Sequence, residues 1–217
     1  ILARYDIGQV THVQSVSGGL MHSTYLVQTE LDQFALQRLH PKLATAEIIS
    51  DYEAVTRHLN SEGALSPLLV RTSDDHPMAV DSDGRWWRLA TWIAGDTMSK
   101  VSSINQAQEG ARALGRFHRV MATFDYEFAS QHPLHDTRAH LDGLRAAINV
   151  SSASEHRESI SSEIDQILGR LPQSMLPESL PQRVVHGDPK ISNVLYRGDR
   201  AVGMIDLDTC NRHTVLV

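Results

Sequence analysis

One short segment near the end of the chain constrains its fold more than any other feature. Residues 185–195 read Val-His-Gly-Asp-Pro-Lys-Ile-Ser-Asn-Val-Leu, so His186, Asp188 and Asn193 follow the pattern His-x-Asp-x-x-x-x-Asn. A glycine before an aspartate and a proline after it are typical of turns, which predicts that Asp188 lies on a loop. A plain turn would explain the glycine and the proline equally well. The residues that follow the loop therefore decide whether the segment is functional.

The residues after this loop predict a β-hairpin. Two apolar runs, 194–196 and 201–207, are joined by the turn Arg-Gly-Asp-Arg, a pattern typical of two antiparallel strands. The second strand would return Asp206 to the loop that carries Asp188 and Asn193. The sequence therefore predicts one site with two carboxylates and an amide.

These side chains suit phosphoryl transfer. That reaction needs a carboxylate to orient the attacking hydroxyl and accept its proton, oxygen ligands for magnesium, and a cation near the transferred group. Asp188 is the candidate catalytic base, and Asn193 and Asp206 are the candidate ligands of Mg²⁺. Lys190, one of only three lysines in the chain, is the candidate cation beside the γ-phosphate of ATP.

The first part of the chain is rich in predicted strands. Alternating apolar and polar residues flank Gly18-Gly19, as in a hairpin. Apolar residues at helical spacing predict a helix over 44–59. The predicted strands span residues 10–17, 23–29, 33–39, 68–71 and 86–93.

The second part is mainly helical until the loop is reached. The prolines at 172, 177 and 181 predict an irregular connection before the final strands. Helical spacing of apolar residues predicts helices over 107–124, 137–150 and 155–168.

This order of elements indicates an α+β, bilobal, protein-kinase-like fold. We expect residues 1–95 to form a β-rich nucleotide-binding lobe and residues 97–217 to form a mainly helical catalytic lobe. A hinge is expected near residues 91–96, where Gly95 ends the strand pattern.

Several segments resemble the aminoglycoside phosphotransferase superfamily. The loop is similar to the family motif His-Gly-Asp-x-x-x-x-Asn followed by Ile-Asp, and the resemblance runs from about residue 8 to the last residue. Within the superfamily, Asp206-Leu207-Asp208-Thr209 and residues 91–95 look most like the N-acetylhexosamine 1-kinase branch. Members continue with helices that shape the acceptor pocket, whereas this chain ends at Val217, so we expect an incomplete acceptor site.

The resemblance implies that ATP and Mg²⁺ bind and that a hydroxyl accepts the γ-phosphate. The implied acceptor is a sugar, a hexose or N-acetylhexosamine, with the anomeric 1-OH as a candidate position. The implied nucleotide contacts are Gly18, Gly19, His22, Gln37, Arg38, Thr91, Trp92 and Ile93. The implied acceptor contacts are Asp188, His135, Asp136, Thr137 and Asp208.

The third predicted strand departs from the kinase pattern because it has no lysine. Strand alternation lets only one of Gln37 and Arg38 face the nucleotide. Charge favours Arg38, whereas the spacing from Ala35 favours Gln37. The acidic partner on the following helix is also open, with three candidates: Glu47, Asp51 and Glu53.

Two other implied sites have simpler readings. Gly18-Gly19 could be a plain hairpin turn. The segment His135-Asp136-Thr137 could cap a helix, because Asp and Thr are good N-caps.

Composition restricts the partners. The net charge of −6 argues against nucleic acid and anionic membranes, which require a basic face. The only cysteine, Cys210, cannot form an internal disulfide, and residues 1–10 lack the apolar core of a signal peptide. These features favour a reducing, cytoplasmic setting.

Other functions remain open on the same fold. An aminoglycoside, choline, homoserine, fructosamine or methylthioribose kinase would differ only in the acceptor. The mixed charges of residues 123–145 suit a neutral sugar better than a polycation. A non-catalytic pseudokinase is disfavoured because Asp188, Asn193 and Asp206 are all present.

Overall fold

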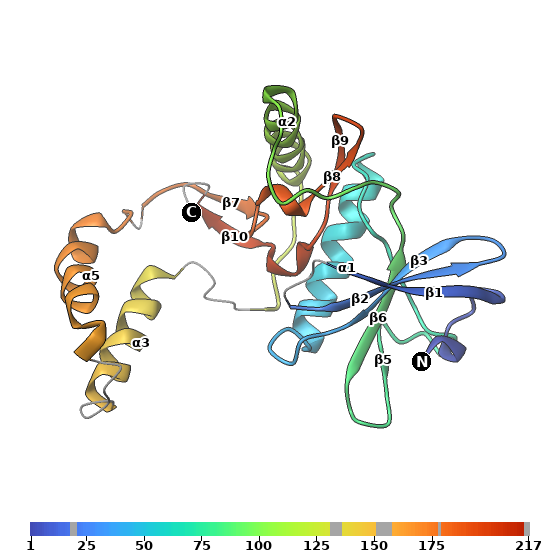
Figure 1. Ribbon diagram of the computed structural model, residues 1–217, viewed down its shortest axis with the longest axis horizontal. Coiled ribbons are helices and arrows are strands. Elements are labelled where there is room, and N and C mark those ends of the chain that lie inside the picture. Colours follow the sequence, from blue (N-terminus) through green and yellow to red (C-terminus); the bar gives the residue numbers. More distant parts are fainter. Residues whose placement is uncertain (18–20, 131–135, 151–157, 178, 215–217) are drawn as a thin grey trace.

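The computed structural model describes residues 1–17, 21–130, 136–150, 158–177 and 179–214 (Figure 1). An antiparallel sheet occupies the first part of the chain, and helices with two small sheets follow. This arrangement confirms the expected α+β fold with a β-rich first lobe.

The large sheet has the strand order β1-β2-β3-β6-β4, with β5 paired to β6. All of its pairs are antiparallel. Its strands are β1 (Val10–Val16), β2 (Ser23–Thr29), β3 (Gln33–Arg38), β4 (Leu69–Val70), β5 (Ala79–Val80) and β6 (Trp86–Thr91). The predicted strands are therefore confirmed, and the two-residue β5 was not predicted.

The helix α1 (Ala46–Ser61) lies between β3 and β4 in the chain. Thr45 begins it as an N-cap, because its side chain accepts a hydrogen bond from the Ile48 N–H. The buried residues Tyr52, Val55 and Leu59 lie on one face of this helix, which is the amphipathic pattern that predicted it.

The second part of the chain contains the remaining helices and strands. These are α2 (Ile104–Met121), α3 (Thr137–Val150), α5 (Ser161–Ser174), β7 (Gln182–Val185), β8 (Val194–Arg197), β9 (Arg200–Met204) and β10 (Asn211–Thr214). Strands β8 and β9 form the predicted hairpin, and β10 pairs with β7. Short 3₁₀ turns lie at Ile191–Asn193, the end of the loop between β7 and β8, and at Leu207–Thr209, after β9.

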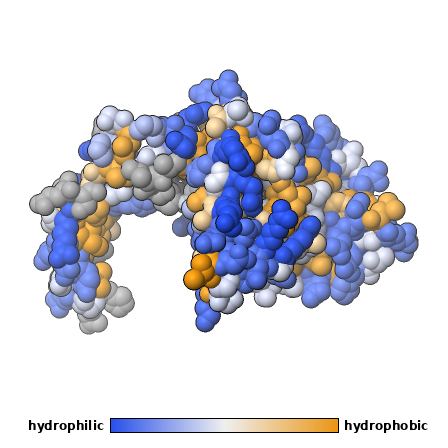
Figure 2. Space-filling view, turned by 90° about the horizontal axis from the view of Figure 1, so that it is seen from above, coloured by the Kyte–Doolittle hydropathy of each residue, from blue (hydrophilic) through white to orange (hydrophobic). Residues whose placement is uncertain are grey.

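Two helices differ from the prediction by several residues: helices were expected over 107–124 and 155–168, whereas α2 spans Ile104–Met121 and α5 spans Ser161–Ser174. Pro172 was expected in an irregular connection, but α5 continues through it to Ser174. Helices α3 and α5 form an arm that projects away from the sheet in Figure 1. Figure 2 shows apolar side chains on the side of this arm that faces the rest of the molecule, and Leu141 is the buried residue of α3.

Two hydrophobic cores stabilise the protein. One lies on the sheet and includes Val27, Leu36 and Leu89. The other joins α1 to the second part of the chain, because Tyr52 and Val55 pack in one cluster with residues of α2, β7, β8 and β9. Helix α1 therefore shares a core with the catalytic half, although it lies in the first half of the sequence.

The expected hinge is bonded to the hairpin. The Asp96 N–H donates to the Tyr196 carbonyl at 2.8 Å, and the Tyr196 N–H donates to the Asp96 carbonyl at 2.9 Å. The Tyr196 hydroxyl also donates to the Gln106 carbonyl in α2. The segment after β6 is thus held against β8.

Among the described residues, no helix combines the length and apolar character that a bilayer span requires.

A second link between the two parts is Asp51 on α1. Its buried carboxylate accepts hydrogen bonds from the Ala129 N–H, the Ser130 N–H and the hydroxyl groups of Tyr126 and Ser130. A carboxylate with this many donors fixes the segment 126–130 on α1.

We expect Asp51→Asn to lower the free energy of unfolding by about 2–3 kcal/mol, because buried donors would lose their acceptor. Chemical denaturation of the purified protein measures this difference. Glu47→Gln, which changes an exposed acid on the same helix, is the matched control and should leave stability unchanged. Equal stability of the two variants would remove Asp51 as an anchor of this segment.

Candidate active site

The candidate catalytic loop, residues 186–193, follows β7, and its shape depends on His186. Its ring Nε2 lies 3.0 Å from the Ile205 carbonyl, while its Nδ1 accepts the Asp188 N–H at 3.3 Å. Because Nδ1 accepts, Nε2 must donate, which defines a neutral tautomer. Burial lowers the pKa of His186, so the ring stays neutral and ties the loop to the end of β9.

Gly187 allows the loop to pass close to the 3₁₀ turn Leu207–Thr209. Its φ is +82°, and a Cβ at this position would lie 2.2 Å from the Thr209 carbonyl oxygen. No other residue fits both conditions. The Thr209 hydroxyl donates to the His186 carbonyl at 2.7 Å, which closes the contact between loop and turn.

Asp188, Asn193 and Asp206 come together at this contact. The Asn193 side-chain N–H group donates to the Asp188 carbonyl at 2.9 Å and lies 3.4 Å from Asp206 Oδ2. The first bond orients the Asn193 amide and leaves its Oδ1 as the atom it can offer to a cation. Lys190 forms an ion pair with Asp188, and both side chains are partly exposed.

Asp206 has an unusual backbone. Its φ of +65° and ψ of +50° lie in the left-handed region, which only a few non-glycine residues adopt and which is often found at functional sites. The Ile205 N–H donates to the Asn193 carbonyl at 2.9 Å. The strain is therefore held by bonds on the residue that precedes Asp206.

A buried ion pair lies beside this cluster and links it to the sheet. Arg88 of β6 donates to Asp208 Oδ1 at 2.5 Å and to Oδ2 at 2.6 Å, in a bidentate pair. Its Nε donates to Gln37 Oε1 at 2.9 Å. The guanidinium carbon lies 3.8 Å from the centre of the Tyr52 ring of α1, a cation–π contact.

The two partners keep each other charged. Burial alone would lower the pKa of Arg88, but the Asp208 carboxylate raises that pKa above its ordinary value. Burial alone would raise the pKa of Asp208, but the Arg88 guanidinium holds that pKa well below its usual range. The pair is ionised in the interior, where a single unpartnered charge would be costly.

His22 also points at Asp208. It is buried, and its Nε2 lies 3.5 Å from Asp208 Oδ2 and has no hydrogen-bond partner among the described residues. His22, Asp206 and Asp208 together bring ligand atoms within 4.8 Å of one another. However, His22 Nδ1 accepts the His40 N–H at 3.1 Å, so neutral His22 carries its hydrogen on Nε2, and that nitrogen cannot bind a metal.

Gln37 and Arg38, the two candidates on the third strand for a contact with the nucleotide, lie on opposite faces of the sheet. Gln37 lies opposite Arg88 in the β3–β6 register and shares its hydrogen bond. Arg38 points to the other face and donates to the Ser23 hydroxyl at 3.0 Å. Gln37 is therefore on the side of Asp208 and Arg38 is not.

None of the three acidic candidates on α1 forms a hydrogen bond or ion pair with Gln37 or Arg38, all five being described residues. Glu47 is exposed, Asp51 caps the segment 126–130, and Glu53 pairs with Arg71 at 2.8 Å. The residue of α1 that reaches the site is Tyr52.

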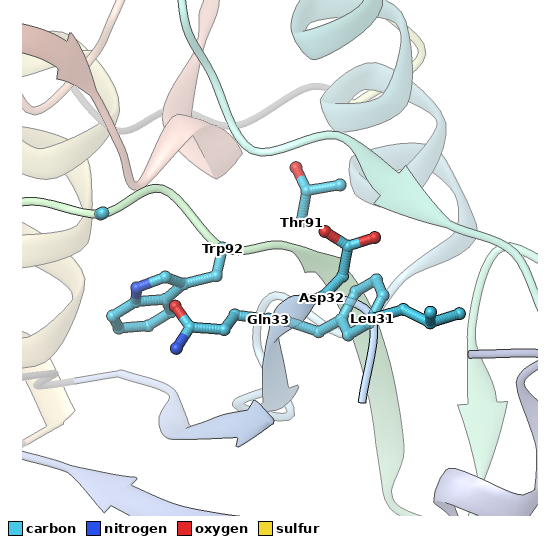
Figure 3. A pocket seen from close by; sticks show the side chains of 7 residues that line it. Leu31, Asp32, Gln33, Thr91 and Trp92 are labelled. Carbon is cyan, nitrogen blue, oxygen red and sulfur yellow. The ribbon is translucent and has the colours of Figure 1, made fainter. Parts of the chain in front are cut away.

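The expected hinge residues follow β6 in order. The Trp92 N–H donates to the Gln33 carbonyl at 3.0 Å, the Thr91 hydroxyl accepts the Leu68 N–H at 2.9 Å, and Ile93 is buried. A hollow of about 370 Å³ opens beside Thr91 and Trp92. Figure 3 shows their side chains with those of the β2–β3 turn around it.

The remaining candidates divide into several groups. Gly18, Gly19 and His135 lie outside the described residues. Asp136 Oδ1 accepts the Ala139 N–H at 2.9 Å, which is the bond of a helix cap, and Thr137 begins α3. Asp208 is buried against Arg88 and offers no oxygen to an acceptor.

Sequence reasoning missed Arg88. It is 1% exposed, and a buried arginine normally has a partner of opposite charge. The usable signal in the sequence is an arginine inside an otherwise largely apolar predicted strand, 86–93.

Residues 12–216 match the family described as phosphotransferase enzyme family. A homoserine kinase of Bradyrhizobium diazoefficiens is 26% identical over 97% of this chain and 62% of its own length. A homoserine kinase of Beijerinckia indica is 27% identical over 94% of this chain and 61% of its own length. The chain thus spans about three-fifths of these relatives.

Solved structures share the fold. Amicoumacin kinase hAmiN, in complex with AMP-PNP, Ca²⁺ and Ami, superposes with a TM-score of 0.68 at 16% identity, over 99% of this chain and 67% of that one. Aminoglycoside phosphotransferase APH(4)-Ia, in a complex with AMP-PNP and hygromycin B, gives a TM-score of 0.66 at 15% identity, over 95% and 70%.

The neutral state of His186 predicts a pH dependence of stability. Above an unfolded pKa of about 6.5, His186 is neutral in both states. Below that pKa, the unfolded chain binds a proton more readily than the folded chain does. The free energy of unfolding therefore decreases as the pH decreases, by up to about 1.4 kcal/mol per pH unit. We expect His186→Gln to be less stable at neutral pH but less sensitive to acid.

Denaturant unfolding between pH 5.5 and 7.5 measures this slope. His118, whose pKa is also lowered by burial, contributes with the same sign, so His118→Gln is the control. A wild-type slope in His186→Gln, together with a reduced slope in His118→Gln, would assign the pH dependence to His118 and contradict the prediction.

Proposed function

Because this chain belongs to the phosphotransferase enzyme family, we propose that the full-length protein transfers the γ-phosphate of ATP to a hydroxyl of a small molecule. The observation that carries the proposal is the cluster of Asp188, Asn193 and Asp206, with Lys190 beside it. Phosphoryl transfer depends on positioned charges more than on covalent chemistry, and this cluster supplies them.

Each residue has a role that its position supports. Asp188, on the exposed loop, hydrogen-bonds the acceptor hydroxyl and takes its proton as the phosphate is transferred. Lys190, now paired with Asp188, is long enough to turn to the γ-phosphate and neutralise its charge. Both roles require that the acceptor lie over the catalytic loop.

The oxygen atoms of Asn193 and Asp206 fit a magnesium ion, which prefers hard oxygen ligands. Mg²⁺ held there would neutralise the phosphate oxygens of ATP. The bond from Asn193 to the Asp188 carbonyl fixes this ligand in relation to the catalytic base.

We propose that ATP binds between the two lobes, next to the large sheet. We assign the adenine to the hinge residues Thr91, Trp92 and Ile93 and the phosphates to the β1–β2 loop, with Gly18 and Gly19. The lobes are taken as residues 1–95 and 97–217.

For the acceptor we favour homoserine over a sugar. Relatives at 26–27% identity over most of the chain are named homoserine kinases. Asp208, one of the residues on which the resemblance to N-acetylhexosamine 1-kinases rests, is used by Arg88. A sugar hydroxyl is the second candidate, because the resemblance to N-acetylhexosamine 1-kinases also includes residues 91–95.

Acceptor-dependent release of ADP from Mg·ATP tests the proposal. The full-length protein is assayed with homoserine, hexoses, N-acetylhexosamines, choline and kanamycin. We expect homoserine to give the highest kcat/KM. Asp188→Asn should lower kcat by about 10²–10⁴-fold, the contribution of a positioned general base, with nucleotide affinity retained.

Two outcomes would contradict this account. Turnover of Asp188→Asn within a few-fold of wild type would remove the base. Turnover of a sugar or aminoglycoside with no response to homoserine would overturn the acceptor while leaving the phosphotransferase chemistry.

A further inference from the structure

The buried positive charge of this site comes from β6 rather than from the third strand, β3. Protein kinases place a lysine on the third strand and pair it with a glutamate of the following helix. Here the third strand has Gln37 in that place. The three acidic residues of α1 are committed to other contacts or exposed.

Arg88 fills the vacant position from the neighbouring strand. It stands opposite Gln37 in the register of β3 and β6, and Gln37 accepts its Nε–H. The helix still contributes a partner, but it is the aromatic face of Tyr52, 3.8 Å from the guanidinium carbon. The carboxylate partner, Asp208, comes from the other half of the chain.

The donors of Arg88 are directed at protein atoms. Three of its N–H groups bond to Asp208 and Gln37, and its side chain is only 2% exposed. A guanidinium in this state acts through the residue that it holds. Asp208 is two residues from Asp206, inside the short turn that follows it.

We propose that Arg88 is a positioning residue for nucleotide-bound magnesium: by clamping Asp208 it fixes the turn that presents Asp206 to the metal. It replaces the strand lysine and helix glutamate with an arginine and an aspartate that bridge the two lobes. This inference rests on the proposed function, since it assumes that Asp206 binds Mg·ATP.

The backbone of Asp206 supports this role. Its left-handed conformation is strained and persists only where the surroundings impose it. Asn193, through its bond from the Ile205 N–H, holds the residue before Asp206, and the Arg88–Asp208 pair holds the residues after it. Without the pair, the turn after Asp206 would lose its link to the sheet and keep only its bond to the loop, from the Thr209 hydroxyl to the His186 carbonyl.

Calorimetry with Mg·AMP-PNP and with AMP-PNP plus EDTA tests the proposal on the full-length protein. Arg88→Lys keeps the charge but loses the two-pronged donor geometry. The double variant Arg88→Met with Asp208→Leu removes both charges, so no unpaired charge is left buried. We expect both to bind Mg·AMP-PNP at least tenfold more weakly, with affinity for metal-free AMP-PNP within about twofold of wild type.

Arg71→Met is the matched control, because Arg71 forms an arginine–carboxylate pair with Glu53 in the same lobe. It should lose stability without losing preference for the magnesium complex. Wild-type affinity for Mg·AMP-PNP in the double variant would overturn the proposal, as would an equal loss in Arg71→Met. If the double variant does not fold, Arg88→Lys decides, by the ratio of its affinities for Mg·AMP-PNP and for metal-free AMP-PNP.

The two proposals fail differently. A wild-type protein that binds Mg·AMP-PNP but transfers phosphate to no acceptor contradicts the proposed function, and the ratio of affinities still decides the role of Arg88. A protein with turnover and an unchanged ratio in both Arg88 variants contradicts only the present inference.

Discussion

The ion pair between Arg88 and Asp208 is the interaction on which the site depends. It joins the sheet of the first lobe to the turn that carries Asp206. Two opposite charges removed from water hold together only when each is fully bonded, and removing one partner of such a pair costs about 3–5 kcal/mol. Gln37 adds a hydrogen bond and Tyr52 a cation–π contact to Arg88, so β3, β6 and α1 all meet at this charge.

Two other contacts hold the same halves together, and each uses a different chemistry. Asp51 fixes the segment 126–130 to α1 through backbone and hydroxyl donors. Asp96 and Tyr196 pair the hinge with the hairpin through main-chain bonds. With α1 in the core of the second half, the loop between β7 and β8 receives a fixed support, while Asp188 and Lys190 on it are partly exposed.

The elements that could be predicted were those with a local pattern. Periodicity and turn residues predicted β1, β2, β3, α1 and the β8–β9 hairpin, and the loop spacing brought Asp188, Asn193 and Asp206 together. Strand β10 is largely polar and is defined by its pairing with β7, so no hydrophobic pattern in the sequence predicted it. Arg88 is 120 residues from Asp208, and its role follows from strand register and packing, which sequence spacing does not encode.

A crystal structure of the full-length protein with Mg·AMP-PNP would test the central claim most directly. The account predicts a magnesium ion about 2.0–2.1 Å from oxygen atoms of Asn193 and Asp206, with the Arg88–Asp208 pair unbroken. A metal bound instead by Asp208 and His22, with Arg88 displaced, would contradict it.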